Sequence, residues 1–204
     1  LMEFMGRESK LTQQIFDTAR TCPQRVVFAE GTHPSMMKAA IKAKDEGFCH
    51  PILLGNDERI EKLARELGLS LEGVEVVNLR HDREAERRER FARILTEKRQ
   101  REGYTFEEAN DKMFERNYFG MMMVETGDAD ACITGLYTKY SNTIKVAKEV
   151  IGLQEGYKYF GTMHILNSKK GTYFVADTLI NRTHDVDSLI DIARLSEKTV
   201  RFFN

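Results

Sequence analysis

Tryptophan is absent from this chain of 204 residues, and both cysteine and proline occur only three times. With 14 glycines besides, the chain has too few breaker residues for a collagen-like or low-complexity sequence. The cysteines, Cys22, Cys49 and Cys132, are odd in number and form no Cys-x-x-Cys pair. The sequence therefore indicates neither a disulfide framework nor a zinc site.

Long apolar runs and an excess of one charge are also missing. No stretch approaches the ~20 apolar residues of a membrane span, and the first six residues lack the leader of a signal peptide. The 31 Lys and Arg residues balance 32 Asp and Glu residues, which leaves no basic footprint for a nucleic acid. We therefore expect a cytoplasmic protein with no nucleic-acid partner and no membrane. The five histidines lack metal-ligand spacing, so no metal is expected.

Short apolar runs that alternate with amphipathic stretches organise most of the chain. The runs lie at residues 26–29, 51–54, 74–77 and 131–134, and a helical pattern follows each. Continuous apolar runs are typical of parallel strands covered on both faces, and right-handed crossovers place helices on both sides. The sequence predicts an α/β fold with three αβα layers around a mainly parallel sheet.

Two helical segments lie between the third and fourth runs. Residues 80–102 interleave opposite charges, with Glu84 four residues before Arg88 and Glu86 four before Arg90, which is typical of a solvated helix face. Thr105 and Glu108 then form the capping box of a second helix. Its predicted inner face carries Phe106, Ala109, Met113, Met121 and Val124.

The pattern changes after residue 150, which predicts a second subdomain. We expect a linker and helix at 1–22, a first subdomain at 23–150, and part of a second at 151–204. The last contains a hairpin of residues 159–166 and 172–176 and a helix with Leu189, Ile192, Ala193, Ser196 and Val200 facing inward. Because nothing follows to complete its layer, this subdomain is expected to be incomplete, and its uncovered surface predicts a dimer or larger assembly.

Candidate ligand-binding residues lie where the predicted strands end. In open α/β sheets ligands bind beyond the carboxyl ends of the strands, which here are residues 30–35, 55–57 and 135–143. The last loop is the most polar: it carries Thr134, Tyr140 and Ser141 ahead of a helix whose free N–H groups favour an anion. These residues are equally compatible with ordinary capping and loop roles. The sequence contains no glycine-rich nucleotide fingerprint and no Gly-x-Ser-x-Gly elbow.

Several blocks of sequence resemble the phosphate acetyl/butyryltransferase family. The blocks occur in the family's order: RVVFAEGTHP from Arg25, PILLGN from Pro51, EGYTFEEA from Glu102, GDADACITG from Gly127 and KKGTYFVADT from Lys169. Together with the segment from Arg116 and YSNTIK from Tyr140, they most resemble the C-terminal domain of bacterial hybrid NADP-dependent malic enzymes.

The resemblance implies a fold related to isocitrate and isopropylmalate dehydrogenases, with acetyl-CoA bound between two subdomains. Arg99 matches a family arginine that holds an anionic group. Lys145 stands where the family usually has an arginine followed by proline, and lysine lacks the planar fork of arginine. The family's Ser, Arg and Asp active-site segment would fall after Asn204, so no catalytic residue is assigned here.

The resemblance leaves three functions open. The first is a regulatory domain, free of cofactors itself, that binds acetyl-CoA or a related acyl-CoA or phosphate ligand in a homo-oligomeric malic enzyme whose separate catalytic domain holds NADP and a divalent metal. The second is part of a working phosphate acetyltransferase. The third is an assembly module.

Overall fold

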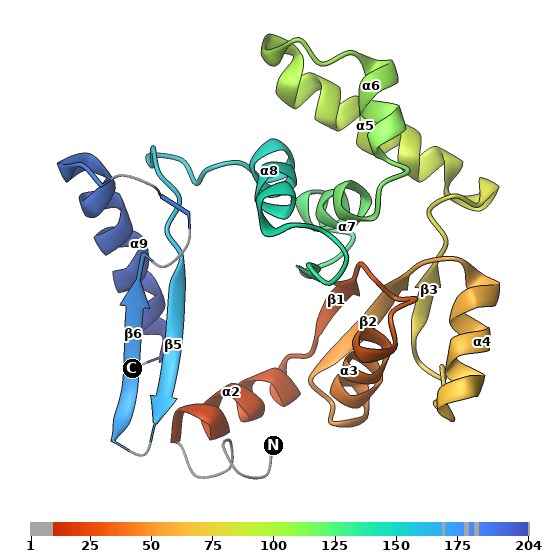
Figure 1. Ribbon diagram of the computed structural model, residues 1–204, viewed down its shortest axis with the longest axis horizontal. Coiled ribbons are helices and arrows are strands. Elements are labelled where there is room, and N and C mark those ends of the chain that lie inside the picture. Colours follow the sequence, from red (N-terminus) through yellow and green to blue (C-terminus); the bar gives the residue numbers. More distant parts are fainter. Residues whose placement is uncertain (1–9, 169, 178–179, 182–183, 204) are drawn as a thin grey trace. The chain divides into compact units, whose positions relative to one another are not determined.

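A computed structural model describes residues 10–168, 170–177, 180–181 and 184–203, so residues 1–9 of the expected linker and Lys169 of the expected hairpin turn lie outside it. The chain divides into two compact units (Figure 1). One comprises Thr18–Gly152, and the other takes in the residues up to Asp17 and those from Leu153 onward. The helix α2 (Lys10–Thr21) therefore begins in one unit and ends in the other.

The larger unit is built on a parallel sheet. Its four strands are β1 (Gln24–Phe28), β2 (Cys49–Leu54), β3 (Glu75–Val77) and β4 (Ala131–Ile133), in the order β3-β2-β1-β4. All three neighbouring pairs are parallel. The strands occupy the four apolar runs of the sequence, and the predicted parallel sheet is confirmed.

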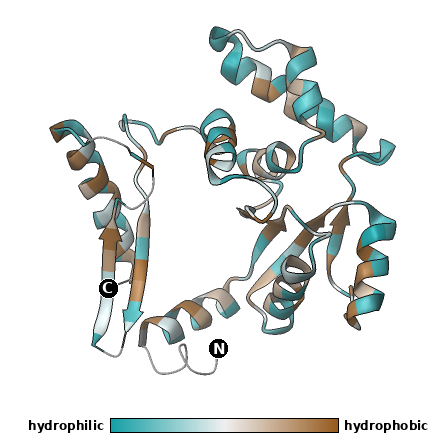
Figure 2. Cartoon of the chain, in the orientation of Figure 1, coloured by the Kyte–Doolittle hydropathy of each residue, from teal (hydrophilic) through white to brown (hydrophobic). Residues whose placement is uncertain are grey.

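Helices cover both faces of this sheet, as a three-layer fold requires. Because side chains alternate along a strand, Val27 and Leu54 enter one apolar cluster, and Phe28 and Leu53 enter the other. The second cluster is completed by α3 (Pro34–Asp45) and α4 (Asp57–Leu67). Figure 2 shows the strands of this sheet as largely hydrophobic and α4 as hydrophobic along one side.

The first cluster is closed by the helices that follow β3. These are α5 (Ala85–Arg99), α6 (Phe106–Lys112), α7 (Arg116–Glu125) and α8 (Tyr140–Val150). The capping box of Thr105 and Glu108 is confirmed at the start of α6. The prediction of one continuous helix was wrong, because a turn at residues 113–115 separates α6 from α7. Phe106, expected on the inner face, is 39% exposed at the start of α6.

The charged run is less solvated than its pattern suggests. It folds as η1 (Asp82–Glu84), α5 and η2 (Gln100–Glu102). Both Glu84 and Arg88 are buried, and Arg88 donates to the carbonyl oxygens of Leu79 at 2.7 Å and His81 at 2.9 Å. The expected pairs of Glu84 with Arg88 and of Glu86 with Arg90 are not among the ion pairs of the described chain, since Arg88 binds carbonyl oxygens and Arg90 binds Asp128. The pair of the same spacing between Glu89 and Arg93 does form, at 2.5 Å.

The smaller unit contains the predicted hairpin. β5 (Met163–Ser168) and β6 (Gly171–Ala176) pair antiparallel, and β6 contacts α9 (Val186–Phe203). The predicted inner face of α9 was partly wrong. Leu189 and Ala193 are exposed, whereas Ser188, Asp191 and Ile192 are buried. Asp191 faces inward because its carboxylate accepts from the backbone N–H groups of Lys158 and Tyr159.

Gly120 permits the close approach of α7 to the sheet. A Cβ at this position would lie 3.1 Å from Sγ of Cys132 and 3.3 Å from side-chain atoms of Leu54 and Val27. We expect Gly120→Val to lower the free energy of unfolding by about 1–3 kcal/mol through overpacking. Urea unfolding measures this. Glu61→Val at an exposed position of α4 is the control and should cost less than ~0.7 kcal/mol; equal losses would contradict the packing argument.

Candidate functional site

The sheet has a topological switch point between β1 and β4. The chain proceeds outward from β1 through β2 to β3 and then returns to place β4 on the other side of β1. Loops that leave β1 and β4 therefore diverge, and ligands of open α/β sheets bind at such a point, beyond the carboxyl ends of the strands. The described residues contain no group of three His, Cys, Asp or Glu side chains placed to hold a metal ion.

Glu30 joins the ends of the two strands at this point. It follows β1, is 2% exposed, and its Oε1 accepts from the Gly135 N–H at 3.0 Å and lies 3.0 Å from the Thr134 hydroxyl. Oγ1 of Thr134 also lies 2.6 Å from Oδ1 of Asn117, which is buried at the start of α7. The other carboxylate oxygen of Glu30 is buried and has no hydrogen-bond partner within the described part of the chain.

A cavity of about 650 Å³ opens beside this cluster. It lies beyond the carboxyl ends of β1, β2 and β3, and the loops after β1, β2 and β4 all contribute residues. The polar lining residues that carry the later argument are Glu30, Arg59, Arg80, Arg116, Asn117 and Thr138.

The structure brings some of the sequence-derived candidates to this region and not others. Thr134 belongs to the Glu30 cluster. Tyr140 and Ser141 begin α8, and Tyr140 is exposed. Thr138 precedes them, accepts from Nδ2 of Asn117 at 3.3 Å, and thus ties the start of α8 to the cluster. None of Thr134, Tyr140 and Ser141 is itself a lining residue of the cavity.

Arg99 lies at the opposite end of α8, where it acts as a cap. Its Nε donates to the carbonyl oxygen of Glu149 at 2.7 Å, and its Nη2 donates to that of Lys148 at 2.6 Å. Its Nη1 donates to Glu102 at 2.7 Å, so all three nitrogens are engaged and the side chain is 17% exposed. With a rise of 1.5 Å per residue, about 12 Å of helix separates this end from Ser141.

Lys145 lies between these ends and remains accessible. Its side chain is 68% exposed, and its Nζ is 3.8 Å from Glu149 one turn along α8. Glu149 in turn accepts hydrogen bonds from the hydroxyls of Tyr104, at 2.5 Å, and Tyr118. Burial would raise the pKa of Glu149, but these bonds and the cations of Lys112 and Lys145 hold the pKa below its ordinary value of 4.5. Burial and the same carboxylate raise the pKa of Tyr104 to about 12.

Comparison with known proteins identifies the family of this chain. The profile described as "Phosphate acetyl/butaryl transferase" matches residues 10–204. The chain belongs to this family. The solved EutD phosphotransacetylase of Staphylococcus aureus superposes with a TM-score of 0.82 at 26% identity over 95% of the chain and 57% of that protein. A phosphotransacetylase from Streptococcus pyogenes superposes with a TM-score of 0.81 at 26% identity over 94% of the chain and 59% of that protein.

Two kinds of curated relative match the chain. An NADP-dependent malic enzyme of Escherichia coli is 34% identical over the whole chain, which spans 27% of that enzyme. A phosphate acetyltransferase of Bacillus subtilis is 30% identical over 88% of the chain, which spans 54% of that enzyme. The chain is thus homologous to the phosphotransacetylase-like part of NADP-dependent malic enzymes and to phosphate acetyltransferases, and it spans only part of either.

Sequence reasoning missed Arg80, Arg116 and Asn117. Arg80 follows β3 as the loops of residues 30–35, 55–57 and 135–143 follow the other strands, so the same rule applied to the third strand would have found it. Arg80 was overlooked because it begins a run of charged residues that is typical of a solvated helix face. Arg116 and Asn117 begin α7, and no local pattern distinguishes them from surface residues. No helix within the described residues is long and apolar enough to cross a membrane.

Glu149 should make stability depend on pH. Its pKa is lower in the folded chain than in the unfolded chain, so its stabilisation is complete above pH 4.5 and is lost as the pH falls through the folded-state pKa. We expect Glu149→Gln to lower the free energy of unfolding by roughly 1–2 kcal/mol at pH 7, because a charged acceptor becomes neutral.

Urea unfolding of both proteins from pH 7 to pH 3 measures the effect, and the difference between them should shrink with acid. Glu97→Gln removes an exposed carboxylate of α5 that has no polar partner among the described residues, and it serves as the control. A difference that stayed constant across this range would contradict the assignment.

Proposed function

We propose that this chain is the acetyl-CoA-binding, regulatory part of an NADP-dependent malic enzyme, which oxidatively decarboxylates malate to pyruvate. The observation that carries the proposal is the similarity over the whole chain to the Escherichia coli malic enzyme, of which it spans 27%. A separate catalytic domain of the parent would hold NADP and the divalent metal. The parent would be a cytoplasmic homo-oligomer.

The geometry of α8 supports a binding role. Lys145 offers an exposed cation on this helix, and Tyr140 and Ser141 stand at its N-terminus, where free N–H groups favour anions. Lysine at this position attracts an anion but cannot grip a phosphate with two parallel hydrogen bonds. Binding of the acidic part of acetyl-CoA is therefore better supported than acyl transfer. Arg99 contributes by holding the other end of α8.

The second candidate is part of a catalytic phosphate acetyltransferase, which the 30% identity to the Bacillus subtilis enzyme favours. The two functions differ in one measurable activity. We expect this chain to form no acetyl phosphate from acetyl-CoA and phosphate, because orientation of reactants is worth ~7–11 kcal/mol of barrier and Lys145 lacks the required fork. A coupled assay of CoA release measures it, and turnover dependent on phosphate would favour the second candidate.

Lys145 should contribute to the affinity for acetyl-CoA. We expect Lys145→Ala to raise, by roughly tenfold or more, the acetyl-CoA concentration that half-inhibits malate decarboxylation by the parent enzyme, because a charged hydrogen bond is worth ~1.5–3 kcal/mol. Lys145→Arg should hold or tighten binding. Activity without acetyl-CoA should not change, since allostery couples two distinct sites.

Lys62→Ala is the matched control for this titration. Lys62 is also an exposed lysine paired with a glutamate one turn further along its helix, but it lies on α4. Arg99→Ala should weaken inhibition as well, together with a lower melting temperature, because it uncaps α8. Identical inhibition curves for Lys145→Ala and the unmodified enzyme would remove Lys145 from the site.

A further inference from the structure

We propose that the cavity at the carboxyl ends of β1, β2 and β3 binds a sugar phosphate. In this assignment the phosphate lies against Arg59, Arg80 and Arg116, and a sugar hydroxyl donates to the second carboxylate oxygen of Glu30. Lys145, exposed on α8, is not among the residues that line this cavity, and the proposal does not depend on the function proposed above.

The three arginines that line the cavity have no anionic partner among the described residues. Within the described residues, Arg59 has no side-chain contact, and the guanidinium of Arg80 has only the carbonyl oxygen of Phe114 at 3.5 Å. Arg116 lies over the ring of Tyr137, 5.1 Å from its centroid, and has no carboxylate. Three arginine cations that line one cavity, with no ion-pair partner among the described residues, favour the binding of a doubly charged anion.

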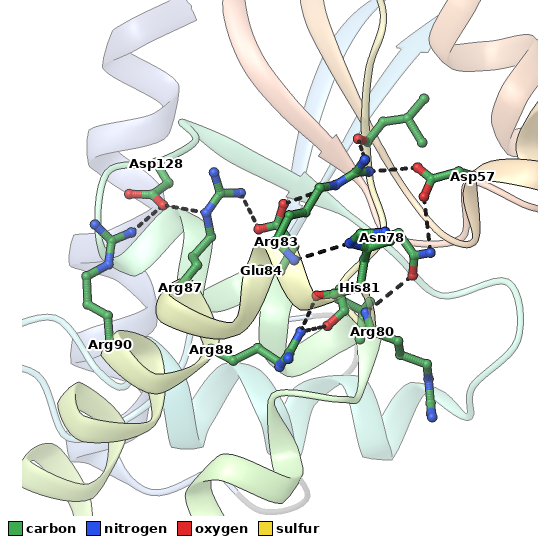
Figure 3. Close-up of polar contacts among 12 residues, drawn as sticks. Asp57, Asn78, Arg80, His81, Arg83, Glu84, Arg87, Arg88, Arg90 and Asp128 are labelled. Atoms are coloured by element: carbon green, nitrogen blue, oxygen red, sulfur yellow. Dashed lines mark hydrogen bonds and ion pairs between the residues drawn. The ribbon is translucent and has the colours of Figure 1, made fainter.

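Of the four arginines that follow Arg80 most closely in the chain, Arg83, Arg87 and Arg90 pair with carboxylates, and Arg88 donates to carbonyl oxygens. Figure 3 shows Arg83, Arg87, Arg88 and Arg90 joined by contacts to other residues, whereas the guanidinium of Arg80 extends away from them with no contact drawn. Arg83 binds Asp57 at 2.7 Å, for example. The guanidinium of Arg80, in contrast, has no carboxylate partner among the described residues.

Glu30 determines the second chemical group that the ligand needs, which is a hydrogen-bond donor. Glu30 lines the cavity; its Oε1 is satisfied, but its Oε2 is buried and has no hydrogen-bond partner among the described residues. An orphaned buried acceptor costs ~1–3 kcal/mol, or more when charged, which a donor from a ligand would offset. An alcohol hydroxyl of the ligand would donate to this oxygen without placing a second negative charge beside the carboxylate.

The three arginines and the Glu30 carboxylate together define the chemical class of the ligand. The ligand needs a phosphate for the arginines and a hydroxyl for the carboxylate. Dinucleotide-binding folds use the same chemistry, because there an acidic side chain accepts from a ribose hydroxyl and an arginine accommodates a phosphate. The volume of about 650 Å³ lies in the range of small-molecule pockets, so a free sugar phosphate and a ribonucleotide both fit in size.

Glu115 is the one acidic lining residue besides Glu30. It is exposed, so water screens its charge, and three arginines outnumber the two carboxylates. The cavity as a whole therefore favours an anion. Its buried carboxylate, that of Glu30, favours a neutral hydrogen-bond donor on the same ligand.

Isothermal calorimetry of the intact protein with ribose 5-phosphate, n-pentyl phosphate, inorganic phosphate and AMP tests the proposal. We expect ribose 5-phosphate or AMP to bind at least tenfold more tightly than n-pentyl phosphate and inorganic phosphate, which carry no alcohol hydroxyl. Tighter binding of ribose 5-phosphate than of AMP would indicate a free sugar phosphate, and the reverse would indicate a nucleotide. No binding of either, or equal binding of n-pentyl phosphate, would overturn the proposal.

Variants test the individual contacts. Arg59→Ala should weaken binding at least tenfold, and its exposed position makes misfolding no concern. Arg65→Ala, an equally exposed arginine of α4 outside the cavity, is the control and should change binding less than twofold. Glu30→Gln, checked for folding by thermal melting, should abolish the preference for ribose 5-phosphate over n-pentyl phosphate. An unchanged affinity in Arg59→Ala or an unchanged preference in Glu30→Gln would contradict the assignment.

Discussion

The contact of Glu30 with Thr134 and Gly135 is the one on which the arrangement of the larger unit depends. It joins the carboxyl ends of β1 and β4, which are separated by 104 residues of chain, at the place where the strand order reverses. A buried carboxylate is stable only when its oxygens are hydrogen bonded. Oε1 meets that condition, and Oε2 has no partner among the described residues, so the group that closes the sheet also leaves one buried acceptor unsatisfied.

The elements predicted correctly from the sequence are those determined by local patterns. The apolar runs of β1 and β2 and the capping box of Thr105 and Glu108 each fall within a few residues, so the sequence shows them directly. The inner face of α9 was harder to predict, because Asp191 is turned inward by two backbone N–H groups more than 30 residues away. No hydropathy pattern contains that information.

The candidate site was predictable only in outline. The rule on strand ends pointed to the edge of the sheet where the cavity opens, and the loops that it singled out contain or adjoin Glu30 and Thr134. It did not show that Arg99 would be occupied by carbonyl oxygens some 50 residues along the chain, or that Arg80 would lack a partner. Whether an arginine is engaged depends on which distant acceptors the fold brings near it, and spacing in the sequence does not determine that.

The contacts of Arg99 give this side chain a structural role at the end of α8. An isolated helix of eleven residues is marginal, so the position of α8 depends on groups outside it. Asn117 and Thr138 hold the loop at its start, while Lys98 and Arg99 bind the carbonyl oxygens at its end. Arg99 thereby fixes the helix that carries Lys145. An arginine that the sequence suggests as a direct ligand contact can therefore act indirectly, by holding in place the helix that carries the exposed cation.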